Sequence, residues 1–214
     1  MLRDPVSRKR FFRLMGGTGA AGALAVVVAA CGDDEEEAGS GDTGSETGDA
    51  DALAQFGEGD IGIANYALTL EYLEADFYSK AAESGMLKGA ALELGKSFGE
   101  HEQAHVEALE KMIKDAGGTP ADKPKTEFPL DSQDQILELA ATVENLGAAA
   151  YLGQAANIES EDILAAALSI HTVEGRHAAA LNKTIGKPIT PDGAFAKPAS
   201  AQEVLDEVQQ FIKS

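Results

Sequence analysis

The chain has 214 residues and a formal net charge of −19 at pH 7, because 36 acidic residues stand against 17 basic ones. This length suggests one domain with tails, and the acidity argues against nucleic acid as a partner, since binding a phosphate backbone needs a basic surface. Alanine and glycine are abundant, aromatic residues are scarce and tryptophan is absent, which suits close-packed helices better than a sheet.

Residues 1–31 have the pattern of an export signal. The segment 7–13, Ser-Arg-Lys-Arg-Phe-Phe-Arg, resembles a twin-arginine export motif in which Lys9 replaces the second arginine, and a small-residue apolar run follows at 14–30. The segment 28–31, Val-Ala-Ala-Cys, resembles a bacterial lipobox. That resemblance implies a lipid on Cys31 that anchors the protein to the outer face of the cell membrane without spanning it. The alternative is an ordinary signal or a single-span anchor in which Cys31 has no role.

Residues 32–57 form an acidic segment that is rich in glycine and serine and contains no lysine or arginine. Such a segment cannot bury enough apolar surface to fold. We therefore expect a disordered linker that acts as a solvated tether between the lipid anchor and a domain that begins near residue 58.

Four long segments with helical hydrophobic periodicity follow, at about 60–84, 87–116, 132–158 and 160–184. Short connections within the first and second pairs make each pair an antiparallel hairpin, whereas the proline-bearing connection 119–130 is long enough to cross the bundle. Ser132 and Gln135 fit a capping box at the start of the third helix. The predicted fold class is all-α, an antiparallel four-helix bundle over 58–186 with one long crossover. Residues 187–214 add a loop and a short amphipathic helix at about 200–212.

The two predicted hairpins repeat the same polar residues. In each, a glutamate is followed seven residues later by a tyrosine, and a Glu-x-x-His motif lies on the next helix. The first set is Glu71, Tyr78, Glu102 and His105, and the second is Glu144, Tyr151, Glu174 and His177. All of them lie on apolar helix faces, where four carboxylates cannot all be ionised close together without cations. Two divalent metal ions bridged by two of the glutamates resolve this, and carboxylate and imidazole donors suit iron or manganese.

This constellation resembles the ferritin-like di-metal carboxylate family, in which two helices each supply one glutamate and two others each supply a Glu-x-x-His motif. The chain is similar in particular to exported bacterial ferritin-like proteins akin to plant desiccation-related proteins, over about residues 58–186. The resemblance suggests that Glu102 and Glu174 bridge two iron or two manganese ions. The full ligand set that it implies is Glu71, Glu102, His105, Glu144, Glu174 and His177.

Glu74 is an alternative ligand on the first helix, one turn from Glu71 and on a more apolar face. The repeat favours Glu71, because only Glu71 shares with Glu144 a tyrosine seven residues later; Glu74 is then an extra ligand or a neighbour of the ligands. Tyr78 and Tyr151 are either core residues or hydrogen-bond donors to the cross-related glutamates.

Two histidines and three glycines lie in or beside these motifs without being among the candidate ligands. His101 and His171 are expected at the helix surface or between helices, with a role as an outer ligand as the alternative. Gly147, Gly153 and Gly175 each cost about 1 kcal/mol inside a helix relative to alanine. Their use is either close helix approach or room beside the metals, which the sequence leaves open.

The resemblance implies redox chemistry at the metal pair, as an exported ferroxidase, peroxidase or manganese-catalase-like enzyme that oxidises ferrous iron or reduces peroxide or dioxygen. The alternative suggested by the desiccation-related relatives is a metal-binding or stress-protection protein without turnover. A purely structural bundle, with glutamates and histidines paired to each other, would leave two lone glutamates in the core. The sequence leaves open iron or manganese and the oligomeric state, for which a homodimer is one option.

Overall fold

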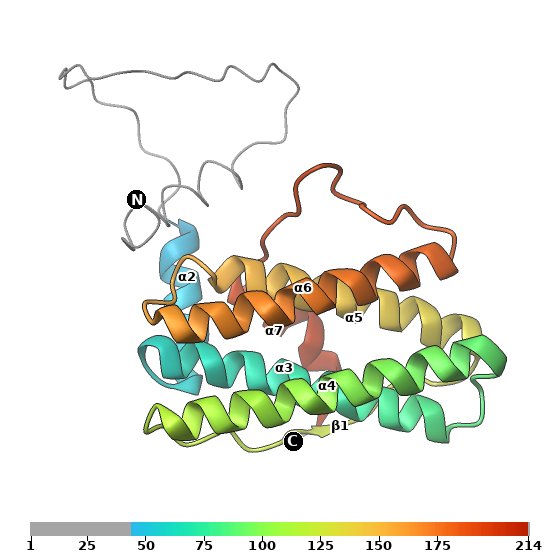
Figure 1. The fold of residues 1–214 in the computed structure, drawn as a ribbon, viewed down its shortest axis with the longest axis horizontal. Coiled ribbons are helices and arrows are strands. Elements are labelled where there is room, and N and C mark those ends of the chain that lie inside the picture. The colour runs from blue at the N-terminus through green and yellow to red at the C-terminus, as the bar shows by residue number, and fades with distance from the viewer. Residues whose placement is uncertain (1–43, 214) are drawn as a thin grey trace, which may run out of the picture.

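The structure is a computed structural model that describes the backbone of residues 44–213 and the side chains of residues 49–213. The predicted signal peptide, Cys31 and the first part of the acidic segment lie outside the described residues. Figure 1 shows the long helices side by side, with short elements before and after them in the chain. The elements are α2 (Gly44–Leu53), η1 (Ala54–Phe56), α3 (Gly59–Glu83), α4 (Gly89–Asp115), β1 (Lys125–Thr126), α5 (Gln133–Gln154), α6 (Glu161–Thr184), α7 (Ala201–Val208), η2 (Gln209–Phe211) and β2 (Ile212–Lys213).

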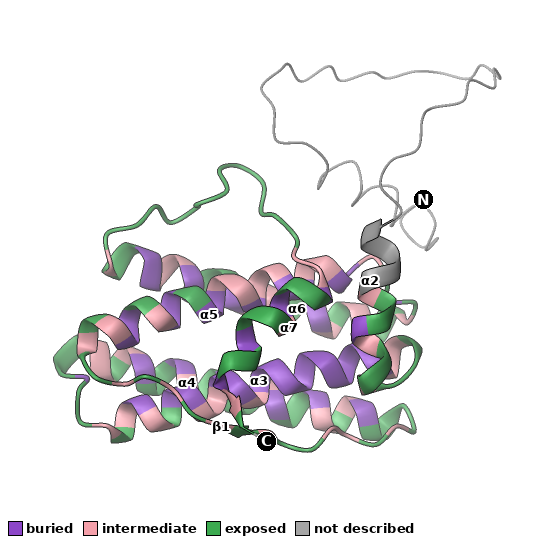
Figure 2. Ribbon diagram, turned by 180° about the vertical axis from the view of Figure 1, so that it is seen from behind, coloured by how far each residue is buried: buried purple, intermediate pink, exposed green. Residues whose placement is uncertain are grey.

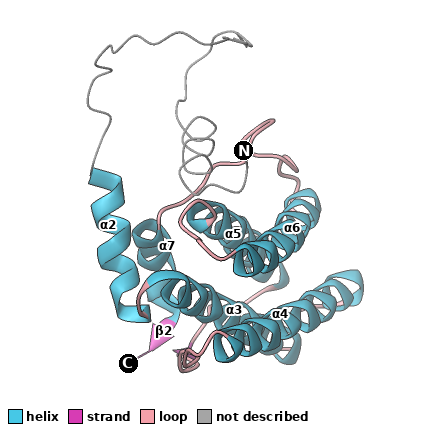
Figure 3. Ribbon diagram, turned by 60° about the vertical axis from the view of Figure 1, so that its left-hand side comes forward, coloured by secondary structure: helices cyan, strands magenta, loops and turns pink. Residues whose placement is uncertain are grey.

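The predicted all-α four-helix bundle is confirmed. Helix α3 packs along α4 and α5 packs along α6, so the bundle consists of two hairpins, which Figure 3 shows as two layers. Figure 2 shows that the buried residues follow the inward faces of these helices. None of the helices in the described part of the chain is long and apolar enough to cross a membrane.

The starts of the second hairpin's helices follow the polar signals of the sequence. Ser132 accepts a hydrogen bond from the backbone N–H of Gln135, as predicted, but the Gln135 side chain accepts from Asp131 rather than completing a capping box with Ser132. Helix α5 ends at Gln154, four residues before the predicted end at 158. Ser160 caps α6 through the backbone N–H of Ile163.

The long crossover between α4 and α5 is extended, as its three prolines predict. It contains β1, which pairs antiparallel with β2 at the C-terminal end of the described chain. Lys80 on α3 donates a hydrogen bond to the carbonyl oxygen of Thr126 at 2.6 Å and fastens the crossover to the bundle.

The end of the acidic segment differs from the prediction of a disordered linker up to residue 57, because residues 44–56 are helical. Ala52 is buried against α7 and α3, and Asp49 accepts a hydrogen bond from the backbone N–H of Ala201 at 2.6 Å. The apolar residues near Ala52 give this short stretch a surface to bury, which the more acidic residues before it lack. The folded domain therefore includes α2 and η1.

Candidate metal centre

All four helices of the bundle contribute acidic or imidazole side chains to its centre. The four glutamates of the repeat are completely buried at 0% exposure, and His177 is 3% exposed. His105 is slightly more open, with 12% of its side chain exposed. The structure thus brings together every residue of the predicted ligand set: Glu71 from α3, Glu102 and His105 from α4, Glu144 from α5, and Glu174 and His177 from α6.

These six side chains form two overlapping groups that could each hold a metal ion. In each group, one ligand atom from each of four residues lies within 4.8 Å of the others. The first group is Glu71, Glu102, His105 and Glu174, and the second is Glu102, Glu144, Glu174 and His177. Glu102 and Glu174 belong to both groups, which is the arrangement that a bridging pair requires.

The two histidines face the groups with the same nitrogen. Nδ1 of His105 lies 2.8 Å from Oε2 of Glu102 and 3.2 Å from Oε2 of Glu71. Nδ1 of His177 lies 2.9 Å from Oε1 of Glu102 and 3.2 Å from Oε2 of Glu144. The matching orientation reflects the pseudo-twofold relation between the two hairpins.

Several of these buried atoms have no hydrogen-bond partner among the described residues: Oε1 of Glu102, Oε2 of Glu144, both carboxylate oxygens of Glu174 and Nδ1 of His177. Nδ1 of His177 and Oε1 of Glu102 are within hydrogen-bond distance, yet their geometry does not make a hydrogen bond. Buried polar atoms without partners are rare, because each costs about 1–3 kcal/mol. These oxygen and nitrogen atoms point toward one another without hydrogen bonds between them, as metal ligands do. The residues present therefore suit a pair of divalent ions.

Tyr78 and Tyr151 hold the outer oxygens of two glutamates. The hydroxyl of Tyr78 donates to Oε1 of Glu144 and that of Tyr151 donates to Oε1 of Glu71, both at 2.5 Å. Each bond runs between α3 and α5. The structure therefore contains the hydrogen bonds to the cross-related glutamates, one of the two roles expected for these tyrosines from the sequence. Burial raises the pKa of both hydroxyls well above the usual value, which keeps them protonated as donors.

Burial and neighbouring charges move the pKa values of these carboxyl groups in different directions. Burial raises the pKa of Glu71 to about 7. Burial and the nearby Glu71 carboxylate raise the pKa of Glu174 well above its usual range. Burial also acts on Glu102, but the adjacent His105 and His177 outweigh it and hold its pKa at about 2. Protons or cations must therefore neutralise part of this cluster, and metal ions would displace the protons.

Glu74 lies beside the two groups and belongs to neither. It is 3% exposed, and burial together with the Glu174 carboxylate raises its pKa well above the usual value. Gly147 on α5 leaves room for both carboxylates, because a Cβ there would lie 2.9 Å from Oε1 of Glu74 and 3.1 Å from Oε2 of Glu174. Gly147 therefore provides space beside the centre, one of the two roles the sequence allowed.

His101 lies on α4 where this helix meets α6, and it contacts the centre from outside. Its Nδ1 is 2.9 Å from Nε2 of His177, the nitrogen on the far side of that ring from the carboxylates. The only sequence signal for this contact is that His101 directly precedes Glu102. His171, by contrast, hydrogen-bonds through Nδ1 to the carbonyl oxygen of Ala148 at 3.0 Å and belongs to neither group.

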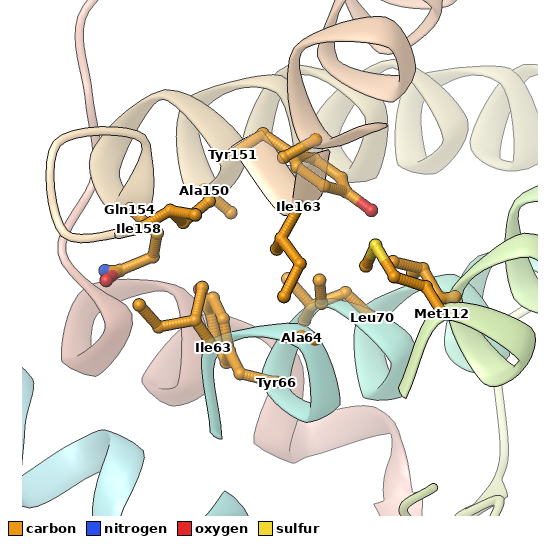
Figure 4. Close-up of a pocket in the computed structure, with 13 residues that line it drawn as sticks. Ile63, Ala64, Tyr66, Leu70, Met112, Ala150, Tyr151, Gln154, Ile158 and Ile163 are labelled. Atoms are coloured by element: carbon orange, nitrogen blue, oxygen red, sulfur yellow. The ribbon is translucent and has the colours of Figure 1, made fainter. Parts of the chain in front are cut away.

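An apolar cavity of about 20 Å³ lies in the bundle core next to the centre. Side chains from all four helices line it, among them Ile63, Leu70, Met112, Tyr151 and Ile163 (Figure 4). Tyr151 is shared by the two regions, because its ring lines the cavity and its hydroxyl bonds to Glu71. Apolar cavities of this kind tend to stay dry.

Comparison with known proteins agrees with this architecture. A family model described as a ferritin-like domain matches residues 59–187. The chain is also similar to a solved structure, a conserved hypothetical protein, rv2844, from Mycobacterium tuberculosis. The TM-score is 0.52 at 19% sequence identity, and the match covers 66% of this chain and 93% of that one. At this identity the likeness concerns the fold alone. No curated protein sequence matches the chain.

Proposed function

The chain belongs to the family of ferritin-like domains, and we propose that it is an exported protein that binds two iron or two manganese ions in the centre of its bundle. On this proposal the ions would oxidise ferrous iron or reduce dioxygen or peroxide when bound. The proposed ligands are the six residues of the two groups described above: Glu71, Glu102, His105, Glu144, Glu174 and His177.

The observation that carries the proposal is the pair of overlapping groups that share Glu102 and Glu174. Two isolated sites would need separate ligand sets, whereas two shared carboxylates suit two ions that lie close together. The unpartnered buried atoms support this, since a bundle stabilised only by Glu–His pairs would hydrogen-bond them.

The chain's own side chains would orient and shield the centre. Tyr78 and Tyr151 fix the outer oxygens of Glu144 and Glu71, which leaves the second oxygen of each directed at a histidine. Glu102 is hydrogen-bonded only through Oε2, to His105, and neither oxygen of Glu174 has a hydrogen-bond partner among the described residues. The two shared carboxylates would therefore be freer than Glu71 and Glu144 to shift as the charge of the centre changes.

Between the two oxidants, the apolar cavity beside Tyr151 favours dioxygen. Peroxide would give up hydrogen bonds to water on entering this apolar cavity and regain few of them there. Dioxygen is apolar and has few such hydrogen bonds to give up. A metal-loaded protein that consumes dioxygen while it oxidises ferrous iron, and consumes peroxide slowly, would support this choice. The reverse preference would contradict it.

The second candidate function is metal binding or stress protection without turnover. The extensive burial of the centre favours it, because all four glutamates and both tyrosines are inaccessible to large substrates. Reactivity separates the two candidates. A turnover enzyme consumes an excess of ferrous iron and oxidant over metal centres, whereas a passive binder stops after one equivalent per site.

Export and lipid anchoring are also proposed, from the twin-arginine-like and lipobox-like segments of residues 1–31. On this proposal a Cys31→Ser variant is released from the membrane fraction and loses incorporated fatty acid. Equal membrane association of the variant and the wild type would contradict a lipid on Cys31.

The experiment that tests the metal site is metal content by mass spectrometry. The protein would comprise residues 32–214, loaded with iron or manganese and freed of loosely bound ions. The proposal predicts close to two ions per chain, lost in a Glu102→Ala, Glu174→Ala double variant and kept in Glu107→Ala, which removes an exposed glutamate of the same α4 helix. Equal metal in all three proteins, or none in the wild type, would refute it.

A further inference from the structure

His101 is the one described residue that hydrogen-bonds to the outward-facing nitrogen of a candidate metal-binding histidine. Nδ1 of His101 lies 2.9 Å from Nε2 of His177. The two rings are nearly parallel, at 8°, with their centroids 5.1 Å apart. Rings that are parallel at that separation, with two nitrogens in hydrogen-bond contact, lie edge to edge, so the proton between them lies close to both ring planes.

Phe98 fixes the ring of His177 from one face. The centroids of the two rings are 3.8 Å apart and their planes are inclined by 21°. Phe98 is 6% exposed and cannot move aside freely. The ring of His177 is thus held against rotation by stacking and held in its plane by the contact with His101.

Metal binding requires a neutral imidazole on His177, and the contact with His101 then favours one of its two nitrogens as the N–H. A neutral imidazole has one N–H and one lone pair. With Nε2 as the donor to Nδ1 of His101, the lone pair of Nδ1 on His177 faces Glu102 and Glu144, where the second metal group lies. Metal-binding histidines usually donate their other N–H to a neighbour, which fixes the tautomer and the ring orientation.

This support exists in only one half of the repeat. The residue that corresponds to His101, directly before the second Glu-x-x-His motif, is Val173, which has no polar side-chain atom. Within the described part of the chain, Nε2 of His105 makes no hydrogen bond, and its Nδ1 contacts Glu71, Glu102 and Glu174 instead. The two metal positions are therefore supported differently.

Building on the proposed metal function, we propose that His101 is a positioning residue that holds His177 in its metal-binding tautomer and thereby sets the affinity of the second metal position alone. His101 is exposed, and it touches His177 rather than the convergent ligand atoms. Removing its acceptor nitrogen should leave the first position, held by Glu71 and His105, unchanged.

Titration with Co²⁺, followed by its visible absorption and by metal content, tests this in three proteins. The wild type should bind two ions. His101→Phe keeps an aromatic ring without an acceptor, and its second ion should bind about 10- to 100-fold more weakly while the first binds as before. His101→Gln restores an acceptor oxygen and should recover most of the second affinity. A His101→Phe protein with both wild-type affinities, or one that loses both equally, would overturn the proposal.

A second measurement needs no variant. In ¹⁵N-labelled wild-type protein loaded with Zn²⁺ as a diamagnetic probe, the proposal predicts a protonated Nε2 of His177 and a scalar coupling to Nδ1 of His101 across the hydrogen bond. A metal-bound Nε2, or a protonated Nδ1 on His177, would overturn it. A wild type that binds neither Co²⁺ nor Zn²⁺ would overturn the proposed function and this inference with it. A His101→Phe protein that binds two ions with the same affinities as the wild type would overturn this inference alone.

Discussion

Replacing Gly147 by alanine tests how tightly the carboxylates of the centre are packed. The new Cβ would lie 2.9 Å from Oε1 of Glu74 and 3.1 Å from Oε2 of Glu174, closer than atoms normally approach a methyl group. Gly175→Ala is the matched control, because it adds the same methyl group inside α6 where no atom lies within 4 Å. The two substitutions share their effect on helix propensity and differ in what the methyl group meets.

The expected magnitudes follow from these surroundings. Alanine in place of glycine inside a helix gains about 1 kcal/mol, so Gly175→Ala should raise the free energy of unfolding by that amount. At Gly147 an overpacking cost of about 1–3 kcal/mol opposes the gain, so the metal-free variant should be between equally stable and about 2 kcal/mol less stable than the wild type. Turning Glu174 away should weaken metal binding about 10- to 100-fold, which corresponds to about 1.4–2.8 kcal/mol.

Urea unfolding of chelator-treated and metal-loaded protein measures both effects. The metal-free Gly147→Ala protein should fall below Gly175→Ala in stability, and the difference should widen when metal is added. If Gly147→Ala gained the same 1 kcal/mol or so as Gly175→Ala and bound metal as the wild type does, the packing argument at Glu174 would be wrong.

Three further predictions concern the metal-free protein. The folded-state pKa values of Glu71 and His177 are raised to about 7 and about 9. Their protonated forms therefore stabilise the fold at low pH, and this contribution is lost as pH rises through those values. Thermal unfolding with chelator should show lower stability at pH 8.5 than at pH 5.5, and equal or higher stability at pH 8.5 would contradict this. Tyr151→Phe leaves a buried carboxylate oxygen without its donor and should cost about 1–3 kcal/mol in urea unfolding, whereas an unchanged midpoint would show that this hydrogen bond is not needed. Asp49→Ala removes the acceptor for the first backbone N–H of α7 and should destabilise the fold by about 1 kcal/mol, with Asp51→Ala, an exposed neighbour, as the control that should not.

The bundle and the residues at its centre are predictable from the sequence because the signals are local. Glu102 and His105 lie one turn apart on the same apolar face, and Glu174 and His177 repeat that spacing. A repeated pattern implies a pseudo-twofold arrangement, which brings four helix faces to one centre. In the same way, Glu71 corresponds to Glu144, because each is followed seven residues later by a tyrosine.

Features that depend on contacts between distant segments were not predictable. The hydrogen bond between His101 and His177 requires the packing of α4 on α6, and no periodic pattern marks it. The docking of α2 depends on Ala52 meeting α7 and on Asp49 meeting the start of α7, while composition alone assigned this stretch to a disordered linker. The pairing of β1 with β2 likewise joins two-residue segments too short for sequence periodicity to detect.

The most direct test of the metal centre is anomalous X-ray diffraction from crystals loaded with manganese or iron. The account predicts two ions about 3.5–4 Å apart, both in contact with Glu102 and Glu174, one also with His105 and the other with His177. A single ion, ions bound only at surface carboxylates, or no ion in the bundle after loading would contradict it.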